Sequence, residues 1–112
     1  MDLKDLAEKL ALTVFQPMGN FDVAVTDGYT GDLLSDVMGN AKEHNIWVTC
    51  QTHENIVAVA RLKNLAAIIL VNGRKPDDIA LAKARDERVI ILGTPESAFA
   101  ITGALAGLFR RK

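Results

Sequence analysis

Short apolar runs separated by segments with helical spacing form the dominant pattern of this chain. Three runs rich in β-branched residues occupy positions 45–50 (NIWVTC), 66–71 (AAIILV) and 88–92 (RVIIL). Continuous apolar runs of this length are typical of strands buried on both faces, as in a parallel sheet covered by helices. A further run at 22–26 (DVAVT) and another at 12–15 (LTVF) bring the predicted sheet to four or five strands.

The segments between these runs place apolar residues three and four positions apart, which is the spacing of one helix face. These stripes predict helices over 33–41, 56–62, 77–84 and 98–109, and 2–9 is expected to form a short N-terminal helix. The last helix is expected to start at Thr94-Pro95-Glu96, because threonine is a good N-cap and proline suits the first helical position.

Strands that alternate with helices through short connections predict an α/β fold with a mostly parallel sheet. We expect a single domain over 1–112, with three layers and a sheet of four to five strands flanked by helices. A chain of 112 residues can bury one core but not two. Its 49% hydrophobic and 24% charged residues are an ordinary globular composition, so disorder is not expected.

Charge and composition argue against several classes of protein. The formal net charge is −1, and basic residues alternate with acidic ones except at 110–112, unlike the basic face of nucleic-acid binders. A single cysteine cannot form an intrachain disulfide, and the N-terminus lacks a secretory pattern, so a cytoplasmic location is expected. No apolar run approaches the roughly 20 residues that span a bilayer, so no membrane association is expected.

Polar residues collect in the loops that follow the predicted strands. In a parallel sheet these loops share the carboxyl edge, where open α/β sheets bind ligands and the N–H groups of helix starts converge. We therefore expect a small anionic ligand or a nucleotide to bind there, with backbone amides contributing to the site. The candidate ligand-binding residues are Asp27, Gly28, Tyr29, Thr30, Gln51, Thr52, His53, Asn72, Gly73, Arg74 and Thr94.

Helix capping is an alternative explanation for part of this set. Every turn from a strand into a helix needs a cap, which by itself would account for Thr30, Thr52, Asp77 and Thr94. Capping does not suit three others, namely Tyr29, His53 and Arg74. A tyrosine can stack on a base, and an arginine can pair with a phosphate or a carboxylate.

Neither a catalytic motif nor a metal site stands out in the sequence. The phosphate-loop pattern G-x-x-x-x-G-K-[ST] is missing, and Gly28-Tyr29-Thr30-Gly31 lacks its lysine. His44 and His53 fall on either side of one predicted strand, so they are not expected to share a metal. Cys50 ends an apolar run, where a free cysteine usually behaves as a small buried hydrophobe. We expect no cofactor, no metal and no enzyme activity, with His53 and Glu54 as the acid-base pair of the alternative in which the chain is an enzyme.

The order of these segments resembles a known family. A strand, QTHEN, a buried helix, AAIILVNGRKPDD, another helix and VIILGTPESAF are together similar to the DRTGG domain, over nearly the whole chain. This α/β module lies beside catalytic domains in phosphotransacetylases and some pyrophosphatases, and it is related to the N-terminal domain of HPr kinase/phosphorylase. DGYTGDLLSDVMGNA joined to WVTCQTHENIVAVA resembles a stand-alone subgroup whose members often accompany iron-only hydrogenase and redox genes. The resemblance implies a regulatory domain rather than a kinase, because the phosphate-binding loop belongs to the other domain of HPr kinase.

The motif that names the family is only partly present. Thr52-His53 stands where the family has Asp-Arg, and Val71-Asn72-Gly73 stands where the family has Thr-Gly-Gly. Gly73 is the residue that matches, and a backbone that turns tightly off a strand favours glycine where φ is positive.

Two functions fit these patterns. The first is a non-catalytic regulatory domain that binds a small anion or a nucleotide at the carboxyl edge of the sheet. The second is a protein-interaction or oligomerisation module, because the helices over 33–41 and 100–109 carry more apolar surface than a small core absorbs. Four small residues would let another helix approach closely, namely Ala100, Gly103, Ala104 and Gly107. A homodimer is therefore expected, and a ligand at a dimer interface would satisfy both functions.

Overall fold

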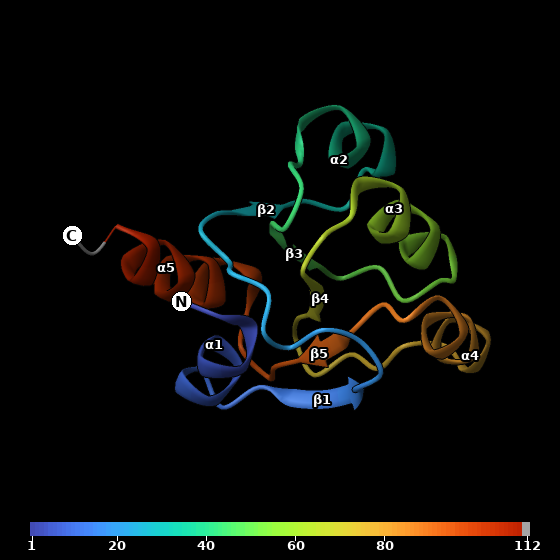
Figure 1. Ribbon diagram of the computed structural model, residues 1–112, viewed down its shortest axis with the longest axis horizontal. Coiled ribbons are helices and arrows are strands. Elements are labelled where there is room, and N and C mark those ends of the chain that lie inside the picture. Colours follow the sequence, from blue (N-terminus) through green and yellow to red (C-terminus); the bar gives the residue numbers. More distant parts are fainter. Residues whose placement is uncertain (111–112) are drawn as a thin grey trace.

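The computed structural model describes residues 1–110, which form five helices and five strands (Figure 1). The elements follow one another as α1 (Leu3–Lys9), β1 (Thr13–Gln16), β2 (Gly28–Thr30), α2 (Leu34–Asn40), β3 (Ile46–Thr49), α3 (Asn55–Lys63), β4 (Ala67–Leu70), α4 (Asp78–Glu87), β5 (Ile91–Gly93) and α5 (Ala98–Phe109). All five predicted helices are present, and four of the predicted strands correspond to β1, β3, β4 and β5. Within residues 1–110 no helix is both long enough and apolar enough to cross a bilayer.

The five strands form one sheet in the order β1-β5-β4-β3-β2. Neighbours from β2 to β5 are parallel, and β1 is antiparallel to β5 at one edge. Every residue of β3 and β4 is buried, as expected for central strands covered on both faces. The prediction of a mostly parallel α/β sheet is therefore confirmed.

Helices cover both faces of this sheet and make three layers. Side chains alternate along each strand, so Ile46 and Val48 of β3 enter one core cluster while Trp47 enters the other. The first cluster joins the sheet to α1 and α5, and the second joins it to α2, α3 and α4. Figure 1 shows these two groups of helices on opposite sides of the strands.

The strand predicted at 22–26 is not part of the sheet, and the strand at this edge is β2, Gly28–Thr30. Residues 22–26 instead run beside the N-terminus, where the Val25 amide donates a hydrogen bond of 2.9 Å to the Met1 carbonyl. Val25 is buried in the first core cluster. The apolar alternation therefore correctly predicted an extended segment at 22–26, but this segment pairs with the N-terminus and not with the sheet.

The start of the last helix also differs from the prediction. Helix α5 begins at Ala98, and its N-cap is Ser97, whose hydroxyl accepts a hydrogen bond of 3.1 Å from the Ala100 amide. The Thr94 hydroxyl accepts instead from the Glu96 amide at 3.1 Å, within the loop. Thr94 is buried because its backbone continues the line of β5, where its amide donates to the Leu70 carbonyl.

Candidate functional site

The carboxyl edge of the sheet is organised around Asp32, which follows β2. Its carboxylate accepts hydrogen bonds from the Thr49 hydroxyl at 2.7 Å and from the Cys50 amide at 2.9 Å. Its backbone carbonyl accepts a third, of 3.1 Å, from the Gln51 side chain. The loop after β2 is thereby attached to the loop after β3.

The electrostatics of this junction keep Asp32 ionised and Cys50 protonated near neutral pH. Burial alone would raise the pKa of Asp32, but the hydrogen bonds from Cys50 and Thr49 and the positive charge of Arg74 together lower that pKa. Burial raises the pKa of the Cys50 thiol, and the neighbouring Asp32 carboxylate raises it further, while Arg74 opposes the change. An ionised carboxylate and a guanidinium thus act on the same small region.

A tight turn at Asn72-Gly73 connects the other two loops of this edge. Both residues adopt the left-handed backbone conformation, with φ of 59° and 70°. The Arg74 amide closes the turn by donating a hydrogen bond of 3.1 Å to the Val71 carbonyl. Glycine and asparagine are the residues that adopt this conformation at least cost. The Asn72 amide donates to the Glu96 carbonyl at 2.8 Å and the Gly73 amide to the Thr94 carbonyl at 2.9 Å, which fixes the turn to the loop after β5.

Four backbone amides at this edge are engaged inside the protein. The Cys50 amide is held by Asp32, the two amides of the Asn72-Gly73 turn by carbonyls, and the Asn55 amide by Nδ1 of His53 at 3.3 Å. These four do not contribute to the predicted amide cradle, so side chains become the main candidates for contacts with a ligand. Exposed side chains with suitable groups are those of Asp32, Gln51, His53, Asn72, Arg74 and Lys75.

Seven of the predicted site residues lie in the loops at this carboxyl edge. They are Gln51, Thr52, His53, Asn72, Gly73, Arg74 and Thr94. Asp32 and Thr49 were not among the predicted site residues, although a carboxylate next to a glycine after a strand would indicate Asp32 once the strand is placed at 28–30. Thr94 is only 5% exposed, so this residue packs inside the loop and offers little surface to a ligand.

The other four predicted residues lie elsewhere, because β2 begins later than expected. Asp27 and Gly28 are at the amino end of β2, where Gly28 pairs with the first residue of β3. The Tyr29 hydroxyl donates to the Asp36 carboxylate on α2. Thr30 exchanges a hydrogen bond of 2.8 Å with Thr102 on α5. These four line a separate hollow of about 80 Å³ between β2 and α5.

The capping alternative does not hold for the residues proposed. The N-cap positions of α2 and α3 are Leu33 and Glu54, so neither Thr30 nor Thr52 caps the helix that follows it. Asp77 does occupy the N-cap position of α4, but its side chain makes no capping hydrogen bond. Helix capping therefore explains neither Thr30 nor Thr52, whereas His53 does bind the first amide of α3 through Nδ1.

Comparisons with known proteins support the fold. No family model matches the chain, and no curated protein sequence matches it. A solved structure that does match contains the CBS and DRTGG domains of the regulatory region of Clostridium perfringens pyrophosphatase, complexed with the activator diadenosine tetraphosphate. The TM-score is 0.65 at 14% identity, over 91% of this chain and 44% of the other, so the chain spans less than half of that protein's length. The fold is DRTGG-like, as the sequence motifs indicated.

Proposed function

We propose that this protein is a non-catalytic regulatory domain that binds a small anionic ligand, most simply a nucleotide, at the carboxyl edge of its sheet. The observation that carries this proposal is that Asp32 and Arg74, from two different loops of the carboxyl edge, are both exposed and that the charge of Arg74 helps to lower the pKa of Asp32. An arginine can hold a phosphate through two parallel hydrogen bonds, and an ionised carboxylate can accept from sugar hydroxyls or base amino groups. Both ends of a nucleotide would therefore find a complementary group.

The rigidity of the surrounding loops supports the same role. Arg74 follows a turn whose backbone is held by two hydrogen bonds to the 94–96 loop, and Asp32 is held by Thr49 and Cys50. Side chains on a fixed backbone lose less freedom when a ligand binds. The solved structure that shares the fold is a regulatory region bound to a dinucleotide activator, which favours a nucleotide as the first ligand to test.

The enzyme alternative has less support. In the pair proposed for it, Nδ1 of His53 accepts a hydrogen bond from the Asn55 amide, so this nitrogen is engaged at the start of α3. Within residues 1–110 no group of three or more His, Cys, Asp or Glu side chains could hold a metal ion. Because the acid-base pair is tied up in this way, we assign the edge to binding and not to turnover.

The test is a thermal-stability titration with AMP, ADP, ATP and diadenosine tetraphosphate. A ligand at 100 times its Kd stabilises the folded state by about 2.7 kcal/mol. Trp47 offers a second readout, because its indole donates a hydrogen bond of 2.9 Å to the Gly31 carbonyl, next to Asp32. Arg74→Gln should abolish both signals, whereas Arg85→Gln, on the exposed last turn of α4, should leave them intact. Stabilisation by none of these nucleotides, or equal stabilisation of the Arg74 variant, would contradict the proposal.

Helix α5 favours a second, compatible function, which is self-association. It carries no charged residue from Ala98 to Phe109, and the Phe99 side chain is 92% exposed. A Cβ added at Gly103 or Gly107 would meet nothing within 4 Å, so packing within the chain does not require glycine there. Each helical glycine costs about 0.5–1 kcal/mol relative to alanine. Close approach of α5 from a second copy of the chain would explain why glycine is present at these two positions.

Sedimentation of the wild type and of Gly103→Ala tests this second function. If two copies pack through this face, the added methyl should weaken the dimer while the isolated fold becomes slightly more stable. Gly39→Ala on α2, where a Cβ also meets nothing within 4 Å, is the matched control and should leave association unchanged. A wild type that stays monomeric at high micromolar concentration would exclude the homodimer.

A further inference from the structure

A second hollow region lies at the opposite, amino edge of the sheet. Two adjoining hollows of about 520 and 130 Å³ share four lining residues, namely Asn20, Asn64, Leu65 and Arg88. Buried Val89 and Ile90 contribute apolar surface to them. None of the seven candidate residues at the carboxyl edge lines either hollow, so this region is separate from the site described above.

The backbone around this region is unusual. The backbone is in the left-handed conformation at His44, Asn64 and Arg88, with φ of 65°, 52° and 59°. These residues precede three neighbouring strands, β3, β4 and β5 respectively. A residue with a Cβ costs roughly 1–2 kcal/mol in this conformation, and only glycine or asparagine adopts it readily. Glycine would therefore suit the backbone better at His44 and Arg88. Asn64 and Arg88 are the C-cap residues of α3 and α4, and helices commonly end in this conformation, so at these two positions the left-handed backbone is explained by the helix ends.

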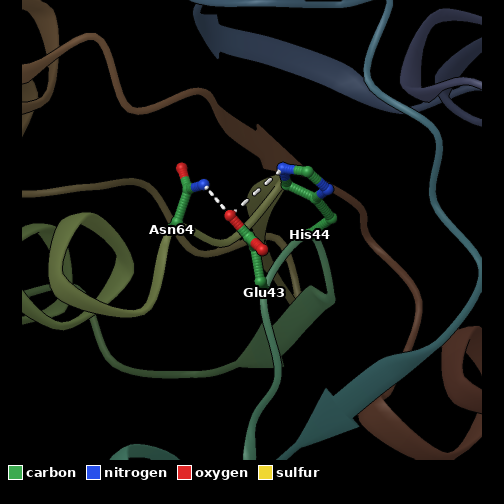
Figure 2. Close-up of polar contacts among 3 residues, drawn as sticks. All are labelled: Glu43, His44 and Asn64. Atoms are coloured by element: carbon green, nitrogen blue, oxygen red, sulfur yellow. Dashed lines mark hydrogen bonds and ion pairs between the residues drawn. The ribbon is translucent and has the colours of Figure 1, made fainter.

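Polar groups on the rim are oriented by hydrogen bonds. Figure 2 shows the Glu43 carboxylate between the Asn64 carboxamide, at 2.6 Å, and Nε2 of His44, at 3.8 Å. Oδ1 of the Asn20 side chain accepts a hydrogen bond of 2.8 Å from the Asp22 amide, which leaves the NH₂ group of the same side chain as a donor. Arg88 takes part in neither of the two ion pairs found among residues 1–110.

The wall beside Asn20 is fixed by close packing. A Cβ on Gly19 would lie 3.0 Å from the Arg88 carbonyl oxygen and 2.7 Å from the Ile90 side chain, so the turn is pressed against the start of β5. The buried Gln16 side chain donates to the Met18 carbonyl at 3.0 Å and to the Val89 carbonyl at 2.8 Å. Asn20 and Arg88 are thereby held on neighbouring segments.

The charges around the hollow decide which ligand it can take. Helices α3 and α4 end here, and a helix C-terminus disfavours an anion by about 0.3–1 kcal/mol. Carbonyls at these ends are already engaged, since the Ala60 carbonyl accepts from the Leu65 amide at 3.0 Å and the Ala84 carbonyl from the Val89 amide at 2.9 Å. A hydrogen bond from a charged group such as Arg88 contributes about 1.5–3 kcal/mol. Of the other charged residues that line the larger hollow, Arg61 and Glu87 pair with each other at 3.4 Å. Arg88 is then the lining charge that faces a ligand, which favours an anion.

We propose that this amino-edge hollow is a second ligand site, which binds a small organic oxyanion. Arg88 and the NH₂ group of Asn20 hold its carboxylate or phosphate, and Leu65 with the apolar surface of β5 contacts its carbon skeleton. The site does not depend on nucleotide binding at the other edge.

Titration of ¹⁵N-labelled protein, followed by amide NMR shifts, tests this proposal with two probes. Inorganic phosphate reports on the oxyanion group alone, and isovalerate reports on a carboxylate with an apolar tail. We expect saturable shifts at His44, Asn64 and Leu65 with at least one probe, and tighter binding of isovalerate if the apolar surface contributes. Failure of both probes to shift these amides, or shifts that never saturate, would overturn the proposal.

Arg88→Gly separates binding from folding, because glycine relieves the left-handed strain at this position. The variant should be at least as stable as the wild type and should bind the probe at least tenfold more weakly. Arg88→Lys should retain part of the affinity, and Arg85→Gln should retain all of it. Equal binding by wild type and Arg88→Gly would show that Arg88 does not hold the anion.

Discussion

The hydroxyl of Thr49 donates a hydrogen bond of 2.7 Å to the carboxylate of Asp32, which joins the end of β3 to the loop after β2. These residues are 17 positions apart, and β2 and β3, which precede Asp32 and end at Thr49, are adjacent parallel strands. The contact orients an ionised acceptor at the same edge as Arg74. It also couples the proposed binding surface to the stability of the fold.

The first prediction is that Asp32 makes stability depend on pH in the acid range. The pKa of Asp32 is lowered from 3.8 in the folded protein, so its contribution is fully present above about pH 3.8 and is lost as the pH falls through the lowered folded pKa. Urea unfolding at a series of pH values should show Asp32→Asn to be about 1 kcal/mol less stable than the wild type at neutral pH. The difference should shrink in acid, whereas Asp86→Asn, on an exposed position of α4, should follow the wild type throughout. A constant difference at all pH values would contradict this.

The second prediction concerns the reactivity of Cys50. Burial and the Asp32 carboxylate both raise the pKa of this thiol, so little thiolate is present near pH 7. Alkylation by iodoacetamide should be slow at pH 7 and should accelerate with rising pH. Asp32→Asn removes one of the two causes and should speed the reaction at pH 7, while Asp86→Asn should not. An unchanged rate in Asp32→Asn would show that the carboxylate does not act on the thiol.

The third prediction is that Gln16→Leu destabilises the fold. The Gln16 side chain is 3% exposed, and its NH₂ group donates to the carbonyls of Val89 at 2.8 Å and Ala84 at 3.3 Å. Leucine fills similar space but removes this donor from the buried Val89 carbonyl, which costs about 1–3 kcal/mol, whereas the Ala84 carbonyl still accepts from the Val89 amide. Chemical denaturation should show the loss, and Thr13→Ala on the exposed start of β1 should change stability little. Wild-type stability in Gln16→Leu would refute the role assigned to this side chain.

The fourth prediction is that Gly93→Ala strains the junction of β5 with β1. A Cβ at this position would lie 2.3 Å from Cε2 of Phe15, so the ring or the strand must shift. Overpacking of this kind typically costs about 1–3 kcal/mol. The double variant Gly93→Ala with Phe15→Leu should recover part of the loss, because the shorter side chain leaves room. Equal loss in the single and double variants, measured by thermal unfolding, would point to another cause.

Much of the fold could be predicted because central strands and helix faces have local signatures. The fully buried runs of β3 and β4 contain almost only large apolar residues, and this pattern survives without knowledge of any contact. The five helices follow from apolar spacing in the same way. What failed was the edge of the sheet, since Gly28–Thr30 holds three residues and one glycine, too little for a recognisable strand.

The candidate site was less predictable because its organisation depends on long-range hydrogen bonds. Asp32 is one of several acidic residues near α2, and nothing local distinguishes it from Asp36, which bonds Tyr29 instead. Arg74 was identified because it follows a strand and makes a poor cap. The engaged state of the amides at Asn72 and Gly73 could not be seen in the sequence, since their partners lie more than twenty positions away.

At the Asn72-Gly73 turn the backbone stabilises the fold, while the side chains around it remain available to the proposed site. The main chain of the turn is committed to the 94–96 loop, so the outward groups around it can be exchanged without disturbing the scaffold. Substitutions on this exposed rim should therefore alter the specificity of the proposed site while the sheet and its loops keep their arrangement.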